Sequence, residues 1–193
     1  GVWLFDAADP TAAPRLLESR TAAGILPEAA FSPDGRLIAA RDGNSVRIMA
    51  ADTGAVMAVL SGHTSPIYAL AFSPDGQLIA SASGSWYDAA PDNSVRLWDV
   101  ASGQGRIISE GHYPAISVTF SPDGTQLAAD TANSLVYVWD VQSGAEQYQI
   151  NRTSNSSTGL AFSPDGARLA TAESHGFGLW DAATGEEMTM VKI

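Results

Sequence analysis

The chain has 193 residues, 45% of them hydrophobic, so it can bury one sizeable core or a row of small ones. No apolar run approaches the roughly 18 residues of a membrane-spanning helix, and the absence of cysteine excludes disulfides and thiolate metal sites. The formal net charge of −11 opposes binding to nucleic acid, whose phosphates require clustered Lys and Arg.

The first 20 residues predict only half of a repeating unit. "VWLFD" is typical of one strand and "PRLLES" of an outer strand beside it. No signal peptide is visible, and the opening resembles the middle of a unit, so we expect the native chain to begin earlier. The compartment stays open, with the cytoplasm favoured. One lysine against nine arginines, with abundant alanine, indicates a bacterial origin.

The remainder of the chain repeats one pattern four times. The motif "FSPDG" recurs at intervals of 41, 48 and 42 residues, starting at Phe31, Phe72, Phe120 and Phe162. In the last three units an apolar-Trp-Asp block follows it, ending at Asp99, Asp140 and Asp181. In the first unit this block has decayed to "VRIMA". Periods in the low forties indicate a repeat architecture.

The second unit shows the strands most clearly. Strands are predicted over 67–72, 77–83 and 94–100, and an outer strand such as 55–60 closes each unit. Ser-Pro-Asp-Gly and short Gly turns connect them, which predicts a four-stranded antiparallel sheet. Small and large apolar residues are mixed on both faces, as in sheets that stack on one another. We therefore expect an all-β propeller with a half-blade over 1–20 and blades over 24–60, 66–109, 114–150 and 156–193.

These residues resemble the WD-repeat β-propeller family over essentially the whole chain. The resemblance rests on Gly62-His63 and Gly111-His112, on "FSPDG" and on Trp-Asp, although TolB-type propellers carry turns similar to "FSPDG". The resemblance implies about seven blades. Four and a half blades would then form an open arc, completed by further chain or by a second subunit.

The resemblance also implies a hydrogen-bonded tetrad of His, Ser or Thr, Asp and Trp in each blade. The second unit offers His63, Ser83, Asp92 and Trp98, and the third offers His112, Thr131, Asn133 and Trp139. The fourth keeps Trp180, with Thr153, Ala172 and Ser174 in the other places; the first lacks Trp and His, and Asp42 lies one residue out of register. Because buried polar groups need all their partners, we expect the first and fourth blades to be looser.

Catalytic and metal-binding interpretations are weaker. His63, Ser83 and Asp92 have the residue types of a hydrolase triad, but a nucleophile is not expected to recur with the period of a turn, and no G-x-S-x-G motif is present. His175 stands alone in a turn, and three scattered histidines do not suit zinc. We expect no catalytic, cofactor or metal residue in this segment.

The predicted function is a non-catalytic scaffold for protein–protein interaction. One alternative is the regulatory propeller of a larger enzyme, such as a kinase or an ATPase, whose signatures would lie outside these residues. Another alternative is a ligand-binding propeller of TolB-like or lectin-like type.

The stretch "GSWYDAAP", at 84–91, is longer than its counterparts and carries Trp86 and Tyr87. Such residues are enriched at binding hot spots. The family pattern puts four further candidates on the same face, at the start of each first strand: Pro27, Tyr68, Ile116 and Thr158. Tyr68 would join Trp86 and Tyr87 in one aromatic patch. The alternative is that Trp86 folds back and fills a gap over its scaffold.

Overall fold

The computed structural model describes residues 2–4, 11, 13, 15–18, 29–87, 91–111, 113–152 and 159–192. In these ranges every regular element is a strand. A two-stranded sheet pairs β1 (Val2–Leu4) with β2 (Arg15–Glu18). Four four-stranded antiparallel sheets follow, which we call blades 1 to 4 in chain order. The all-β architecture expected from the sequence is therefore confirmed.

The strands of each blade pair in chain order. Blade 1 contains β3 (Ala29–Phe31), β4 (Leu37–Asp42), β5 (Ser45–Ala50) and β6 (Val56–Ser61). Blade 2 contains β7 (Ile67–Phe72), β8 (Leu78–Ser83), β9 (Ser94–Asp99) and β10 (Gly105–Glu110). Blade 3 contains β11 (Ala115–Phe120), β12 (Gln126–Thr131), β13 (Leu135–Asp140) and β14 (Glu146–Asn151). Blade 4 contains β15 (Leu160–Phe162), β16 (Arg168–Glu173), β17 (Gly176–Asp181) and β18 (Glu187–Lys192).

The Ser-Pro-Asp-Gly turn closes the first hairpin of every blade in the same way. In blade 1 the Ser32 hydroxyl donates to Asp34 Oδ1 at 2.6 Å and accepts from the Leu37 N–H at 2.9 Å. Gly35 has a φ of +71°, which only glycine adopts readily. The Ser32 hydroxyl also holds the pKa of Asp34 below its usual range. These recurring aspartates serve the turns, so the negative charge of the chain does not mark a binding face by itself.

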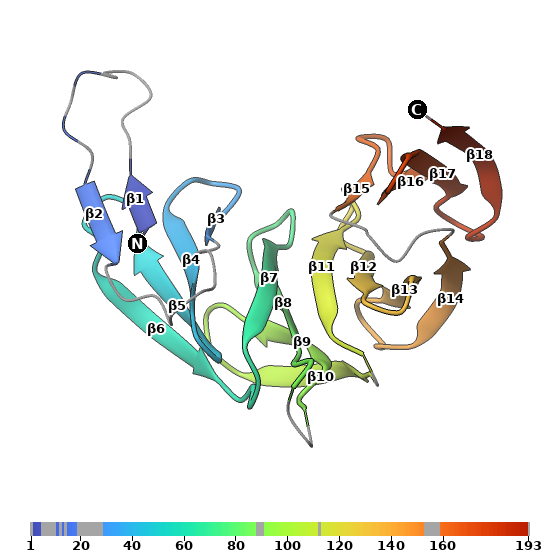
Figure 1. Cartoon of the computed structure of the whole chain (residues 1–193). Coiled ribbons are helices and arrows are strands. Elements are labelled where there is room, and N and C mark those ends of the chain that lie inside the picture. Colours follow the sequence, from blue (N-terminus) through green and yellow to red (C-terminus); the bar gives the residue numbers. More distant parts are fainter. Residues whose placement is uncertain are drawn as a thin grey trace.

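The blades stand face to face in an open row, with β7 beside β11 and β11 beside β15 (Figure 1). Apolar clusters fill each junction: Val46 and Ile48 pack with Ile79 between blades 1 and 2, and Val136 packs with Leu169 between blades 3 and 4. Fully buried alanines, such as Ala80 and Ala128, let neighbouring sheets approach closely. Both faces of the inner blades are therefore covered.

The row does not close on itself within the described residues, because blades 1 and 4 lie at its opposite ends (Figure 1). No described residue range covers the far face of blade 4. Phe177 on this face is 37% exposed, whereas Val136, its equivalent in blade 3, is fully buried. Leu179 beside it is only half-buried, whereas its equivalent Val138 is fully buried.

A buried ion pair stabilises the end of blade 3. Arg152 Nη2 lies 2.6 Å from Asp130 Oδ1, and both side chains are fully buried. Asp130 lies two residues after Ala128 on β12, so the two side chains share a face. Ala128 packs with residues of blade 4, and Asp130 therefore faces blade 4 as well. The equivalent positions in blades 2 and 4 are the alanines Ala82 and Ala172. A buried pair of this kind costs desolvation energy, and removing one member leaves the other charge uncompensated.

We therefore expect Arg152→Met to lower the free energy of unfolding by about 3–5 kcal/mol. The double variant Asp130→Ala with Arg152→Met should be more stable than the single variant, because it removes the buried carboxylate together with the arginine. Urea unfolding followed by circular dichroism measures both. A double variant less stable than Arg152→Met would show that the carboxylate is satisfied without the arginine.

Candidate functional site

Blade 2 contains a complete chain of polar side chains between its strands. The Trp98 indole N–H donates to Ser81 Oγ at 2.8 Å, and Ser81 Oγ lies 2.7 Å from His63 Nε2. His63 Nδ1 lies 3.0 Å from Asp92 Oδ2, which also accepts from the Thr64 N–H at 2.8 Å. Each donor meets an acceptor when the imidazole is neutral and carries its proton on Nδ1. We call Trp98, Ser81, His63 and Asp92 together the blade 2 fastener.

The pKa values of the fastener agree with this protonation. Burial is the largest influence on His63 and lowers its pKa, although the neighbouring Asp92 carboxylate acts in the opposite direction. Burial would raise the pKa of Asp92, but hydrogen bonds from Ser94 and Thr64, together with His63, bring it below its usual range. A neutral His63 beside an ionised Asp92 therefore persists at neutral pH.

The hydroxyl of the fastener belongs to a different serine from the one that the family resemblance implied. Ser83 was expected in this place, but its hydroxyl donates to the Ser65 carbonyl at 2.8 Å and to the Pro66 carbonyl at 3.1 Å. Ser83 therefore ties β8 to the segment before β7, and the assignment to the tetrad is wrong. Side chains two residues apart on a strand point to the same face, so Ser81 and Ser83 both face the same way. Only their positions along β8 relative to Trp98 and His63 distinguish them.

The series Asp92–His63–Ser81 has the order of a hydrolase triad, but its surroundings do not suit nucleophilic catalysis. Ser81 is fully buried, its oxygen already accepts from Trp98, and the His63 side chain is inaccessible. A substrate carbonyl needs access to the nucleophile. The geometry is that of a structural hydrogen-bond chain.

The same position differs in the next two blades. Counting nine residues from each "FSPDG" phenylalanine gives Ser81 in blade 2, Ala129 in blade 3 and Thr171 in blade 4. The Trp180 indole donates to Thr171 Oγ1 at 3.0 Å. Blade 4 therefore has a hydroxyl in the place where the sequence analysis put Ala172. The offset is constant along the sequence, but only the hydrogen bonds from Trp98 and Trp180 identify nine residues as the right one.

Blade 3 lacks this hydroxyl, and its other predicted members adopt different roles. Thr131 Oγ1 lies 2.6 Å from Asn133 Oδ1 and 2.7 Å from the Leu135 carbonyl, so these residues close the turn between β12 and β13. Trp139 is buried and stacks on Tyr137, with ring centroids 5.7 Å apart. His112 lies outside the described residues. Thr131 therefore serves the turn, and no Ser or Thr hydroxyl stands at the position of Ser81 in this blade.

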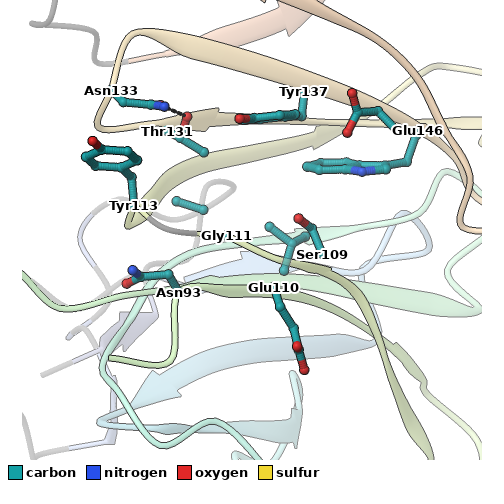
Figure 2. A pocket seen from close by; sticks show the side chains of 12 residues that line it. Asn93, Ser109, Glu110, Gly111, Tyr113, Thr131, Asn133, Tyr137 and Glu146 are labelled. Carbon is teal, nitrogen blue, oxygen red and sulfur yellow. Dashed lines mark hydrogen bonds between the residues drawn. The ribbon is translucent and has the colours of Figure 1, made fainter. Parts of the chain in front are cut away.

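A pocket of about 230 Å³ lies at this place, between blades 2 and 3. We call it the junction pocket. Figure 2 shows Thr131, Asn133 and Tyr137 on one side of it and Asn93, Ser109 and Glu110 on the other. The remaining lining residues are Val95, Gly111, Tyr113, Ala115, Trp139 and Glu146. No lysine, arginine or histidine is among these twelve.

The loop that carries Trp86 and Tyr87 projects from the same junction. Tyr87 is 95% exposed and Trp86 is 56% exposed, so neither ring is buried as a plug. The base of the loop is fixed, since the Ser85 N–H donates to Asn93 Oδ1 at 3.2 Å. Gly84 lies so close to Pro114 that a Cβ there would come within 2.4 Å of it.

The other candidates for a binding face are placed less completely. Tyr68 on β7 and Ile116 on β11 are half-buried, whereas Pro27 and Thr158 lie outside the described residues. Two aromatic ring contacts occur in the described ranges, and neither joins Tyr68 to Trp86 or Tyr87. Tyr113, which sequence reasoning did not single out, is 49% exposed beside the loop base. It lies in the segment before β11, where the second unit has Thr64, so the repeat pattern does not predict an aromatic residue there.

Two kinds of feature are absent from the part of the chain that the structure describes. No group of three or more His, Cys, Asp or Glu side chains could hold a metal ion. No helix there has the length and apolar character needed to span a bilayer.

Asp92 of blade 2 and Asp42, its nearest counterpart in blade 1, should differ in their importance for stability. Asp92→Ala leaves the Thr64 N–H without its acceptor and leaves His63 Nδ1 only the longer 3.2 Å contact with Ser94 Oγ, which should cost about 1–3 kcal/mol. Asp42→Ala removes only a partly exposed ion pair with Arg47, worth up to about 1 kcal/mol. Melting temperatures measured side by side test this. Equal losses would contradict the assigned roles.

The comparisons with known proteins agree with this geometry. Residues 54–99 and 105–140 match the family model described as "WD domain, G-beta repeat". Each match begins near the outer strand of one blade and continues through the first three strands of the next, β6 to β9 and β10 to β13. The matched units are those that contain the fastener and the junction pocket.

Curated relatives cover more of the chain. It is 32% identical over 61% of its length to Periodic tryptophan protein 2 of Arabidopsis thaliana and 33% identical over 67% to the Mus musculus homolog. It is 29% identical over 48% of its length to the Protein LST8 homolog of Drosophila melanogaster. The chain spans only 13%, 14% and 31% of these proteins. All three are eukaryotic and give no support to a bacterial origin. The repeats, the blades and these matches together make the chain a member of the WD-repeat family.

Proposed function

We propose that this segment is a non-catalytic scaffold that binds a protein partner through the loop carrying Trp86 and Tyr87. The exposure of both rings on a loop with a fixed base carries the proposal. Large aromatic side chains bury much area with few torsions to fix, so they contribute strongly at interfaces. A rigid scaffold also lowers the entropy lost when the loop is ordered by a partner.

The alternatives differ in how much supports them. A regulatory module of a larger enzyme agrees with the small share of each relative that the chain spans, and the chemistry would then lie outside this segment. A ligand-binding propeller would need a site of its own, which the junction pocket supplies in a small form. Pro27, Tyr68, Ile116 and Thr158 stay predictions as further contact residues, and bacterial origin stays a prediction from composition alone.

We further propose that additional blades, from more chain or a second subunit, cover the far face of blade 4. The half-exposed Phe177 and Leu179 occupy positions that a following blade covers in blades 2 and 3. Apolar sheet faces of several hundred Å² are rarely left exposed by soluble monomers. About seven blades would complete such a ring.

Thiol labelling tests the cover, because this segment has no cysteine of its own. In the full-length protein Phe177→Cys should react slowly with a maleimide, whereas Tyr87→Cys, at a 95% exposed position, should react rapidly. Any native cysteines elsewhere are first replaced. Labelling at equal rates would contradict the additional blades.

The loop is tested by Trp86→Ala with Tyr87→Ala. If it binds a partner, the double variant should lose that partner in a pull-down from the native host while its melting temperature changes little. Met57→Ala, which removes another exposed apolar side chain on β6, is the matched control and should retain capture. Retained capture by the double variant, or a large fall in melting temperature, would count against the binding role.

A further inference from the structure

Blades 2 and 3 carry different groups at one structural position, and the junction pocket lies close to that position in blade 3. In blade 2, His63 fills the space between Ser81 and Asp92. In blade 3 the equivalents are Ala129 and Asn133, so the hydroxyl that would anchor both the indole and an imidazole is missing. The space beside Trp139 is the junction pocket.

The charge of the pocket lining is negative. Glu110 and Glu146 are its only ionisable carboxyl groups, and no basic side chain is among its described lining residues. Glu146 pairs with Trp139 across β13 and β14, and Figure 2 shows its side chain beside Tyr137. The Glu110 carboxylate is directed away from Tyr137 in the same view, at the opposite rim.

The aromatic groups of the pocket add a preference for a cation. Tyr137 and Trp139 form one stacked pair, and Tyr113 stands at the rim with half of its surface exposed. In blade 2 the Arg96 guanidinium lies over the Trp98 ring, 6.0 Å from its centroid. In blade 3 Tyr137 replaces that arginine, and its own ring stacks on Trp139. The rings that remain for contact with a cation are therefore those of Tyr113 and Tyr137.

We propose that the junction pocket receives an arginine or lysine side chain of the protein partner. The carboxylate of Glu146 attracts the cation, and the rings of Tyr113 and Tyr137 contact its alkyl stem or planar group. Asn133 offers a polar contact at the end of the pocket beside Tyr113, away from Glu146 (Figure 2). The inference rests on the proposed function, because it assigns the chemistry of the bound partner.

The pocket and the aromatic loop form one continuous surface. Asn93 lines the pocket and accepts the hydrogen bond from the Ser85 N–H. Pro114, against which Gly84 packs, is the neighbour of Tyr113 in the chain. A partner segment whose apolar residue contacts Trp86 can therefore place a nearby basic residue at the pocket.

A small probe tests the pocket without the partner. N-acetyl-arginine amide is titrated into the full-length protein carrying ¹⁵N-labelled tryptophan, and the indole N–H signal of Trp139 is followed by NMR. We expect a saturable shift at Trp139 and none at Trp180, whose indole is held by Thr171. The citrulline analogue, which has the same shape without the charge, should give no saturable shift.

Glu146→Gln should weaken arginine binding roughly two- to fivefold, as expected for one partly exposed charge contact. Glu187→Gln is the matched control, because Glu187 pairs with Trp180 as Glu146 pairs with Trp139. It should bind arginine with unchanged affinity.

Three results would overturn the inference: equal responses to arginine and citrulline, an unchanged affinity in Glu146→Gln, or a saturable shift that appears only in His112→Ala. The last result would mean that the histidine occupies the pocket. None of these results depends on Trp86 or Tyr87, so they are distinguishable from failure of the loop to capture a partner.

Discussion

The packing of one sheet directly on the next is the constraint on which the rest of this structure depends. Residues such as Ala80, Ala128 and Val136 are fully buried because each inner blade is covered on both faces. At this separation there is no room for water to solvate a polar side chain, so every polar group between blades needs a partner within the protein. The hydrogen-bond chain of His63, Ser81, Asp92 and Trp98 meets that need in blade 2.

The same constraint explains why the blades are not equivalent. Blade 4 satisfies its indole with Thr171, and the end of blade 3 pairs Asp130 with Arg152. In blade 3 the anchor hydroxyl is replaced by Ala129, and the junction pocket, lined by aromatic rings and carboxylates, lies beside Trp139. With the role that we propose for this pocket, neighbouring blades serve stability and recognition without a change of fold.

Exposure follows the opposite logic at the loops. The segment at 84–87 is fixed at its base, through Asn93 and Pro114, and Trp86 and Tyr87 are exposed to solvent. Placing such rings on a scaffold that is held by buried hydrogen bonds separates the requirements for stability from those for binding. The residues proposed to bind can therefore vary with little effect on the sheets beneath them.

The sequence by itself determined the repeat, the strand order within each blade and the turn chemistry, because all three depend on residues within a few positions of one another. It also located Trp86 and Tyr87, since an insertion is visible against a regular period. The choice of Ser81 over Ser83 required the tertiary structure, because both lie on one face of β8 and only the packing against Trp98 and His63 distinguishes them. The junction pocket likewise depended on tertiary structure, because only sheet stacking brings Ser109 and Glu110 of blade 2 opposite Tyr137 of blade 3.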